Sequence, residues 1–175
     1  MGAGDKIILS GTIGDHGLAV LSAQEGLRFG SGIKSDVAPL NRLIQRLLGD
    51  AGGIVAMKDP TRGGLANAVN EWASKSKVGI EVEETAVPIH DAVRNACEML
   101  GLDPLTIGNE GKMILGVVPD MAEDMLKVIR HHPYGKNAAI IGKATSIIHG
   151  VVLRTEVGGR RILEPPVGDP VPRIC

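Results

Sequence analysis

The chain has 175 residues, of which 43% are hydrophobic, and its formal net charge is −1. This length is typical of one compact domain, and a nearly neutral chain has no field that would attract nucleic acid or an anionic membrane. Phe, Tyr and Trp occur once each, which excludes an aromatic platform for stacked bases. Small molecules or other proteins are therefore the expected partners.

Targeting, cysteine and metal patterns narrow the class further. No apolar run approaches the roughly 18 residues of a membrane span, and the N-terminus lacks a signal-peptide pattern. The two cysteines, Cys97 and Cys175, lie at unrelated positions, which predicts reduced thiols and a cytoplasmic protein. Five histidines are present, but Cys-x-x-Cys and His-Glu-x-x-His motifs are not, so no metal site is predicted.

The chain begins with a short strand and a glycine-rich loop. The apolar pattern of residues 6–10 predicts a strand. Residues 11–17 contain three glycines, which permit a tight backbone path beside a ligand or another segment. We expect Asp15 and His16 at the tip of this loop. The alternative is that His16 is a turn residue whose ring only forms structural hydrogen bonds.

A helix is expected next. Ser35 or Asp36 is a suitable N-cap, the apolar residues between positions 37 and 48 fall on one face, and Gly49 would end the helix. The later elements follow in chain order: a buried strand at 53–58, a helix with an apolar face at 65–73, a strand with one wet face at 78–83, a helix at 90–101, a strand at 113–118, a helix opened by residues 119–120, and short strands at 138–144, 151–155 and 161–163, the last two joined as a hairpin at 158–159.

Helices and strands thus alternate without an internal repeat or a low-complexity block. The expected fold is α+β, an α/β sandwich built on a mixed sheet. The C-terminal residues 165–175 differ, because four of the eleven are proline. Proline fixes φ and removes a backbone donor, so we expect an extended arm after a domain that spans residues 1–164.

The arm places the thiol of Cys175 at its tip. At about 3.1 Å per residue it could span roughly 30 Å, enough to carry the thiol from one site to another. The alternative is a frayed terminus that happens to end in cysteine. Cys97, by contrast, belongs to a helix face and is expected to be an inert core residue.

Two further motifs could carry chemistry. In Asp-Pro-Thr-Arg-Gly-Gly at 59–64, the order of strand, glycine loop and helix directs backbone N–H groups toward a possible anion. The motif lacks the Lys-Ser/Thr ending of a P-loop, so a simple turn and helix cap stays open. Glu110 precedes a predicted buried strand, where a partly desolvated carboxylate could act as a general base. The alternative is a solvated loop glutamate.

Four motifs in this order resemble the HypE family of hydrogenase maturation proteins: Ser-Gly-Thr-Ile-Gly-Asp-His-Gly at 10–17, Asp-Pro-Thr-Arg-Gly-Gly-Leu at 59–65, Gly-Asn-Glu-Gly-Lys at 108–112 and Pro-Arg-Ile-Cys at 172–175. That family belongs to the superfamily of aminoimidazole ribonucleotide synthetase and selenophosphate synthetase. Its members carry an ATP-binding N-terminal domain before a domain like this one. The resemblance covers nearly the whole chain but only the C-terminal half of the family protein, and it implies a separated or truncated domain.

The resemblance also implies an activity. In the family, the C-terminal cysteine receives a carbamoyl group from a carbamoyltransferase, and ATP-dependent dehydration converts the S-carboxamide to a thiocyanate. The cyanide then goes to the iron of a [NiFe]-hydrogenase precursor on a scaffold complex. Carried over to this sequence, the resemblance implies that Cys175 is the acceptor thiol and that Glu110 is the base that removes an amide proton. It also implies that His16 and Asp15 place the tail. The residues implied to contact phosphate or the other domain are Thr61, Arg62, Gly63 and Gly64.

The main ATP site is expected in the other domain, so this chain alone is expected to be inactive. The family protein is expected to be a homodimer, and the isolated domain could be a monomer. Two other functions stay open. One is another ATP-dependent synthetase of the same superfamily, with an incidental tail cysteine. The other is a non-catalytic docking module for maturation partners.

Overall fold

The computed structural model describes residues 1–27, 29, 32–50 and 52–168. Within these residues, seven strands form one mixed sheet in the order β2-β4-β1-β5-β3-β6-β7. The strands are β1 (Lys6–Leu9), β2 (Ile54–Lys58), β3 (Gly79–Glu83), β4 (Ile114–Val117), β5 (Ala139–Thr145), β6 (Val151–Arg154) and β7 (Arg160–Ile162). The α-helices are α1 (Asp15–Glu25), α2 (Asn41–Asp50), α3 (Gly64–Ser76), α4 (Asp91–Leu100) and α5 (Ala122–Arg130).

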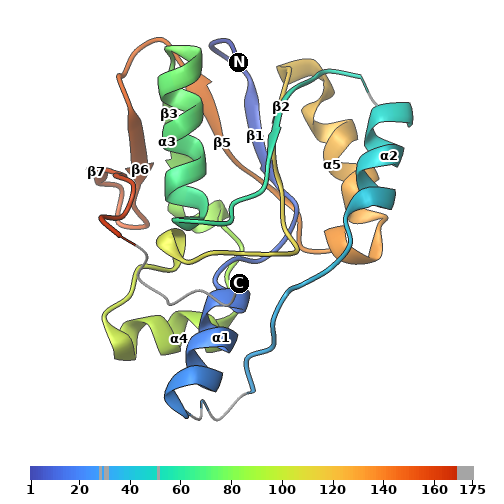
Figure 1. The fold of residues 1–175 in the computed structure, drawn as a ribbon. Coiled ribbons are helices and arrows are strands. Elements are labelled where there is room, and N and C mark those ends of the chain that lie inside the picture. The colour runs from blue at the N-terminus through green and yellow to red at the C-terminus, as the bar shows by residue number, and fades with distance from the viewer. Residues whose placement is uncertain (28, 30–31, 51, 169–175) are drawn as a thin grey trace.

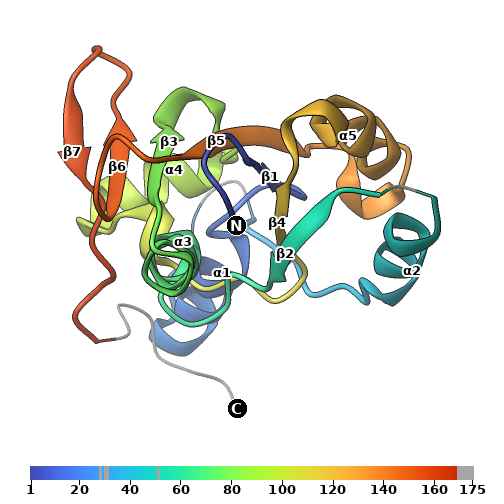
Figure 2. The same cartoon turned by 90° about the horizontal axis from the view of Figure 1, so that it is seen from above.

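Helices cover both faces of the sheet. In the interior strand β1, Ile7 and Leu9 pack in the cluster that contains the apolar side chains of α3, whereas Ile8 packs in the cluster formed with α2 and α5. Neighbouring strands are antiparallel except for β3 and β6, which are parallel. Figures 1 and 2 show α3 on one side of the strands and α5 on the other. The expected α+β sandwich with a mixed sheet is confirmed.

The apolar stripes of two helices are also confirmed. The expected inner face of α3 is buried, and so is that of α5, because apolar residues at helical spacing share one side of the cylinder. The buried positions are Leu65, Ala68, Val69, Trp72 and Ala73 in α3, and Ala122, Met125, Leu126 and Ile129 in α5.

The first glycine-rich motif is not wholly a loop. Helix α1 begins at Asp15, directly after Gly14, whose φ of 86° is accessible to glycine at little cost. Asp15 and His16 therefore lie in the first turn of a helix and not at a loop tip. Leu18 and Val20 anchor α1, and Figure 1 shows α1 beside α4 below the strands.

The helix expected from Ser35 or Asp36 begins only at Asn41. Residues 33–40, here called the linking segment, are irregular. Pro39 explains the difference, because the residue before a proline is disfavoured in the helical conformation. Val37 and Leu48, both expected on the buried face, are each 67% exposed.

Strand β2 is an edge strand and not the buried strand that its apolar run predicts. Among the described residues it pairs with β4 alone, and Val55 is 43% exposed. An apolar run of this length does not distinguish an edge from a central position. In α4, Val93 and Cys97 are buried as expected, but Leu100 is 37% exposed.

The hairpin of β6 and β7 forms as predicted, and Leu163 after it is buried in the main core. The chain then passes the start of α3. The amide of Asn70 donates to the carbonyl of Leu163 at 2.7 Å, and Pro166 lies next to Gly63. Residues 169–175, including Cys175, lie outside the described residues. None of the described helices is both long enough and apolar enough to cross a membrane.

Candidate functional site

Three motifs that are far apart in the sequence meet at the side chain of Asn109. This side chain is fully buried. Its Oδ1 accepts a hydrogen bond from the N–H of Gly14 at 2.8 Å, and its Nδ2 donates to the carbonyls of Pro60 at 3.2 Å and Ile107 at 3.0 Å. A buried amide must satisfy its donors and acceptor, so Asn109 fixes the three motifs relative to one another.

Sequence reasoning named Asn109 only as the neighbour of Glu110. It belongs to no helical or strand period, so burial could not be inferred from a pattern. The available signal is its place beside Gly108 in a glycine-rich stretch. Such stretches commonly mark close approaches of backbone to backbone.

The second motif meets the third by such an approach. A Cβ atom on Gly64, whose φ is +60°, would lie 2.6 Å from the carbonyl oxygen of Ile107 and 2.7 Å from that of Leu105. Gly63 and Gly64 are buried, whereas Thr61 and Arg62 are exposed. The structure thus gives the two glycines a packing role. Contact with phosphate or with another domain stays a prediction for all four residues.

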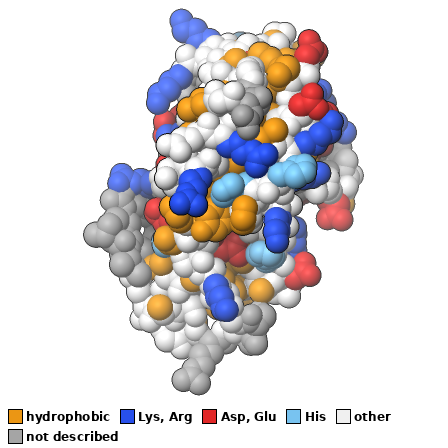
Figure 3. Space-filling view, turned by 90° about the vertical axis from the view of Figure 1, so that its right-hand side faces the viewer, with side chains coloured by type: hydrophobic (Ala, Val, Ile, Leu, Met, Phe, Trp, Pro, Cys, Tyr) orange, Lys and Arg blue, Asp and Glu red, His pale blue; other side chains and the backbone are white. Residues whose placement is uncertain are grey.

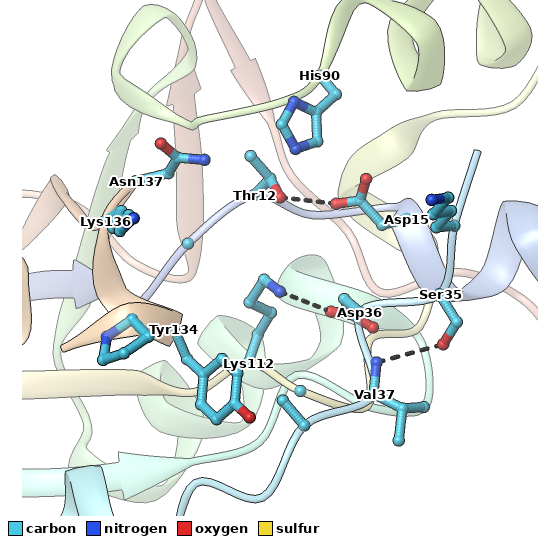
Figure 4. Close-up of a pocket in the computed structure, with 15 residues that line it drawn as sticks. Thr12, Asp15, Ser35, Asp36, Val37, His90, Lys112, Tyr134, Lys136 and Asn137 are labelled. Atoms are coloured by element: carbon cyan, nitrogen blue, oxygen red, sulfur yellow. Dashed lines mark hydrogen bonds and ion pairs between the residues drawn. The ribbon is translucent and has the colours of Figure 1, made fainter. Parts of the chain in front are cut away.

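A cavity of about 430 Å³ lies beside the first and third motifs (Figure 4). Residues from the first motif, the linking segment, the third motif and the stretch after α5 line it. Its charged and histidine lining residues are Lys34, Lys112, Lys136, His90, Asp15 and Asp36. Lysines outnumber carboxylates in this lining, so the cavity favours an anionic or strongly polar ligand.

Basic character extends to the neighbouring surface. The face shown in Figure 3 carries Lys, Arg and His side chains around a group of hydrophobic side chains. This face is the side of the molecule on which Figure 1 places α2 and α5.

Both carboxylates of the cavity are held in place. The hydroxyl of Thr12 donates to Asp15 Oδ2 at 2.7 Å, and Asp15 is 7% exposed. The Asp36 side chain is 3% exposed, and its Oδ2 lies 3.2 Å from Lys112 Nζ, whose side chain is 12% exposed. An ammonium at this distance compensates a carboxylate that would otherwise be costly to bury.

Glu110 lies next to the cavity-lining Gly111 and Lys112, but its side chain is exposed. Within the described residues, the carboxylate of Glu110 is therefore not partly desolvated, contrary to the expectation from the sequence. Its backbone N–H donates to Asp36 Oδ1 at 3.2 Å. The role of Glu110 as a base stays a prediction.

His16 is half-buried at the start of α1, with its Nδ1 2.9 Å from the hydroxyl oxygen of Ser35. The same hydroxyl accepts the N–H of Val37 at 3.2 Å. Sequence reasoning assigned Ser35 and Asp36 to a helix cap and missed both contacts. Among the described residues, no group of three or more His, Cys, Asp or Glu side chains could hold a metal ion.

Cys97 is a buried thiol, as expected. It is 1% exposed, and burial, with smaller contributions from the carboxylates of Asp103 and Glu98, raises its pKa to about 11. At pH 8 a thiol with this pKa should hold roughly 200-fold less reactive thiolate than an ordinary cysteine with a pKa near 8.5. We therefore expect a thiol reagent to label Cys97 at least about 100-fold more slowly in the native chain than in denaturant.

Peptide mapping after timed labelling checks this expectation. Labelling of Cys97 at equal rates with and without denaturant would show that α4 does not shield the sulfur. Free cysteine at the same pH provides the reference rate.

Comparisons with known proteins show which family and which relatives the chain resembles. Residues 2–152 match the family described as AIR synthase related protein, C-terminal domain. A protein of Methanocaldococcus jannaschii named for hydrogenase expression and formation is 56% identical over 172 residues, which cover 98% of this chain and 51% of that protein. The carbamoyl dehydratase HypE of Azotobacter vinelandii is 46% identical over 173 residues, covering 98% and 51%. The chain therefore spans about half the length of these relatives.

Solved structures of HypE proteins superpose closely on this chain. A crystal structure of E. coli HypE superposes with a TM-score of 0.94 at 43% identity, covering 100% of this chain and 54% of that one. HypE in complex with ATP gives 0.92 at 44% identity, covering 97% and 52%, and the HypE–HypF complex gives 0.91 at 44%, covering 95% and 54%. The chain thus belongs to the family described as AIR synthase related protein, C-terminal domain, and over nearly its whole length it is similar to about half of the HypE proteins.

Proposed function

We propose that the chain serves [NiFe]-hydrogenase maturation as the half of a HypE protein that carries the acceptor thiol and presents Glu110 beside a basic cavity. The observation that carries this proposal is the convergence of three motifs on Asn109, which brings Glu110 and Lys112 to the edge of that cavity. The similarity to proteins named carbamoyl dehydratase HypE supports the same reaction class.

The proposed chemistry has two stages. The Cys175 sulfur first accepts a carbamoyl group, which gives an S-carboxamide. Transfer of the γ-phosphoryl group of ATP to the amide oxygen then makes that oxygen a leaving group. The nitrogen loses one proton to solvent when the oxygen is phosphorylated and the second as phosphate departs and the C≡N bond forms, so the products are a thiocyanate, ADP, phosphate and the two protons. Glu110 is the proposed acceptor for a nitrogen proton.

The cavity supports the phosphate-releasing step. Negative charge develops on the departing phosphate, and fixed ammonium groups stabilise such charge most effectively where water is partly excluded. The ammonium of Lys112 is mostly buried, whereas Lys34 and Lys136 lie nearer the solvent. Thr61, Arg62, Gly63 and Gly64 are proposed to meet phosphate or the ATP-binding domain.

The path of the chain before residue 169 supports the proposed tail. Pro166 lies beside Gly63, so the segment runs past the second motif before its last seven residues. Seven extended residues reach at most about 25 Å. We propose that residues 165–175 form a tether that moves the Cys175 thiol between a partner and the cavity.

The proposed partners follow from the two stages. A carbamoyltransferase must load the thiol, and the crystal structure of a HypE–HypF complex supports such a pairing. A scaffold complex that holds iron would receive the cyanide. ATP is assigned to a second domain, and the structure of HypE with ATP supports its use. We further propose a homodimeric two-domain protein, a monomeric isolated domain and a cytoplasmic location, where the thiols stay reduced.

The test is carbamoylation of the chain itself. After incubation with a HypF-type carbamoyltransferase, carbamoyl phosphate and ATP, intact mass spectrometry should show the gain of one carbamoyl group. Peptide mapping should place it on Cys175, and Cys175→Ser should abolish it. Conversion to thiocyanate is expected only when the ATP-binding domain is present.

Two outcomes contradict the proposal. One is modification at Cys97 in place of Cys175. The other is an unmodified chain in a reaction that modifies E. coli HypE, together with retention of the carbamoyltransferase in a pull-down. That second result would favour the docking-module alternative. Another ATP-dependent synthetase would give neither adduct nor pull-down.

A further inference from the structure

We propose that Ser35 and Asp36 of the linking segment are positioning residues that hold His16 and Glu110 in a fixed arrangement beside the cavity. The meaning of this arrangement for catalysis rests on the proposed function. The contacts themselves belong to the described structure, and Figure 4 shows the segment along the cavity with Asp36 facing Lys112.

Asp36 binds the third motif at two points. Its Oδ1 accepts the N–H of Glu110 at 3.2 Å, and its Oδ2 forms the ion pair with Lys112 at 3.2 Å. The contact with Lys112 lacks hydrogen-bond geometry, and Oδ2 has no hydrogen-bond partner among the described residues. The ion pair between Oδ2 and Lys112 therefore compensates charge, whereas the directional hydrogen bond of Asp36 is the one from the Glu110 N–H to Oδ1.

The backbones of the two segments also touch. A Cβ atom on Gly111 would overlap the carbonyl oxygen of Asp36 and lie 2.8 Å from the nitrogen of Ala38. Only glycine permits this approach without displacement. The linking segment and the loop that carries Glu110 therefore cannot shift independently.

Ser35 reaches the first motif from the same segment. Its hydroxyl oxygen accepts the N–H of Val37 and lies 2.9 Å from His16 Nδ1. The hydroxyl can donate to Nδ1 or accept a proton from it, because a hydroxyl oxygen has two acceptor lone pairs and one proton. The contact thus fixes the orientation of the His16 ring.

Two adjacent residues, Ser35 and Asp36, consequently set the mutual geometry of two groups from different motifs. Catalysis by placed groups depends steeply on geometry, and a displacement of about 1 Å can cost roughly 100-fold in rate. Ser35 and Asp36 would act through His16 and Glu110 and need not touch the substrate.

The test is amide exchange and imidazole NMR on the 175-residue chain. Asp36→Ala should speed exchange at the Glu110 amide by about tenfold or more, because its acceptor is lost. Asp36→Asn retains a side-chain oxygen and should restore most of that protection. Ser35→Ala should shift the ring nitrogen signals of His16 and leave Glu110 exchange unchanged. Val37→Ala, a change at a 67% exposed side chain in the same segment, is the matched control.

Exchange at core amides of α3 separates local loosening from global destabilisation. If Glu110 exchanges no faster in Asp36→Ala than in Val37→Ala, Asp36 does not hold the loop. If Ser35→Ala leaves the His16 signals unchanged, the first-motif contact is absent. Either result overturns the corresponding half of the proposal.

A reaction readout uses a two-domain HypE protein that contains this chain. Asp36→Ala should lower thiocyanate formation by about 10- to 100-fold while carbamoylation of Cys175 proceeds at the unaltered rate. Equal loss in both steps would indicate a folding defect and contradict positioning. Failure of the unsubstituted protein to be carbamoylated would instead count against the proposed function.

Discussion

Asn109→Ala is expected to lower the free energy of unfolding by about 3–5 kcal/mol, one of the two largest effects that we predict for this chain. The substitution leaves the N–H of Gly14 and the carbonyl of Ile107 without their partner inside the protein. Each such buried group costs about 1–3 kcal/mol. The carbonyl of Pro60 still accepts the backbone N–H of residue 109, so it adds little.

Urea denaturation of the variant and the parent chain measures this loss. Asn137→Ala, at an exposed asparagine that lines the cavity, is the control and should change stability by less than about 0.5 kcal/mol. Equal effects of the two substitutions would show that the side chain of Asn109 does not hold the three motifs together.

Asn109→Asp offers a test with a pH dependence. The new carboxylate keeps an acceptor for Gly14 but faces the carbonyl of Ile107, and burial favours its neutral form. Its folded pKa would therefore exceed its unfolded pKa. The variant should be least stable above the folded pKa and should gain stability as the pH falls through that value.

Gly64→Ala is expected to destabilise the chain by more than about 3 kcal/mol. The φ of +60° is unfavourable for alanine, and the added Cβ would lie within 2.7 Å of two backbone carbonyl oxygens. Backbone atoms cannot move aside as flexible side chains can. The start of α3 would have to separate from residues 105–107, which also opens the contact between the second and third motifs.

Gly101→Ala separates the two causes. Gly101 has a similar φ of +67°, but no atom of the part of the chain that the structure describes lies within 4 Å of its hypothetical Cβ. This control should cost only about 1 kcal/mol, the conformational part alone. Similar midpoints for the two variants in urea would show that the close approach at Gly64 relaxes without cost.

The sequence predicted those parts of the fold that depend on local pattern. The buried stripes of α3 and α5 follow helical spacing, and the β6–β7 hairpin follows its two glycines. The start of α2 was misplaced because Asp36 resembles a cap. Its carboxylate is instead occupied by Lys112, a residue 76 positions away that no local window includes.

The same distinction applies to the candidate site. The motifs that contain His16 and Glu110 were recognisable as strings of residues, and both positions lie near the cavity. Their dependence on Ser35 and Asp36 was not recognisable, because it arises from contacts between segments and not from spacing within one. The exposure of Glu110 likewise depends on tertiary packing.

The hydrogen bond from Gly14 to Asn109 also bears on how the protein folds. It closes a separation of 95 residues, and the bond from Asn109 to Pro60 closes one of 49. Long-range closures slow folding, because the entropy of a large loop is lost before its contacts form. Strand β1 pairs with β4 and β5 over still longer separations, so the site should form only together with the sheet, and a partly denatured molecule would be unable to assemble it.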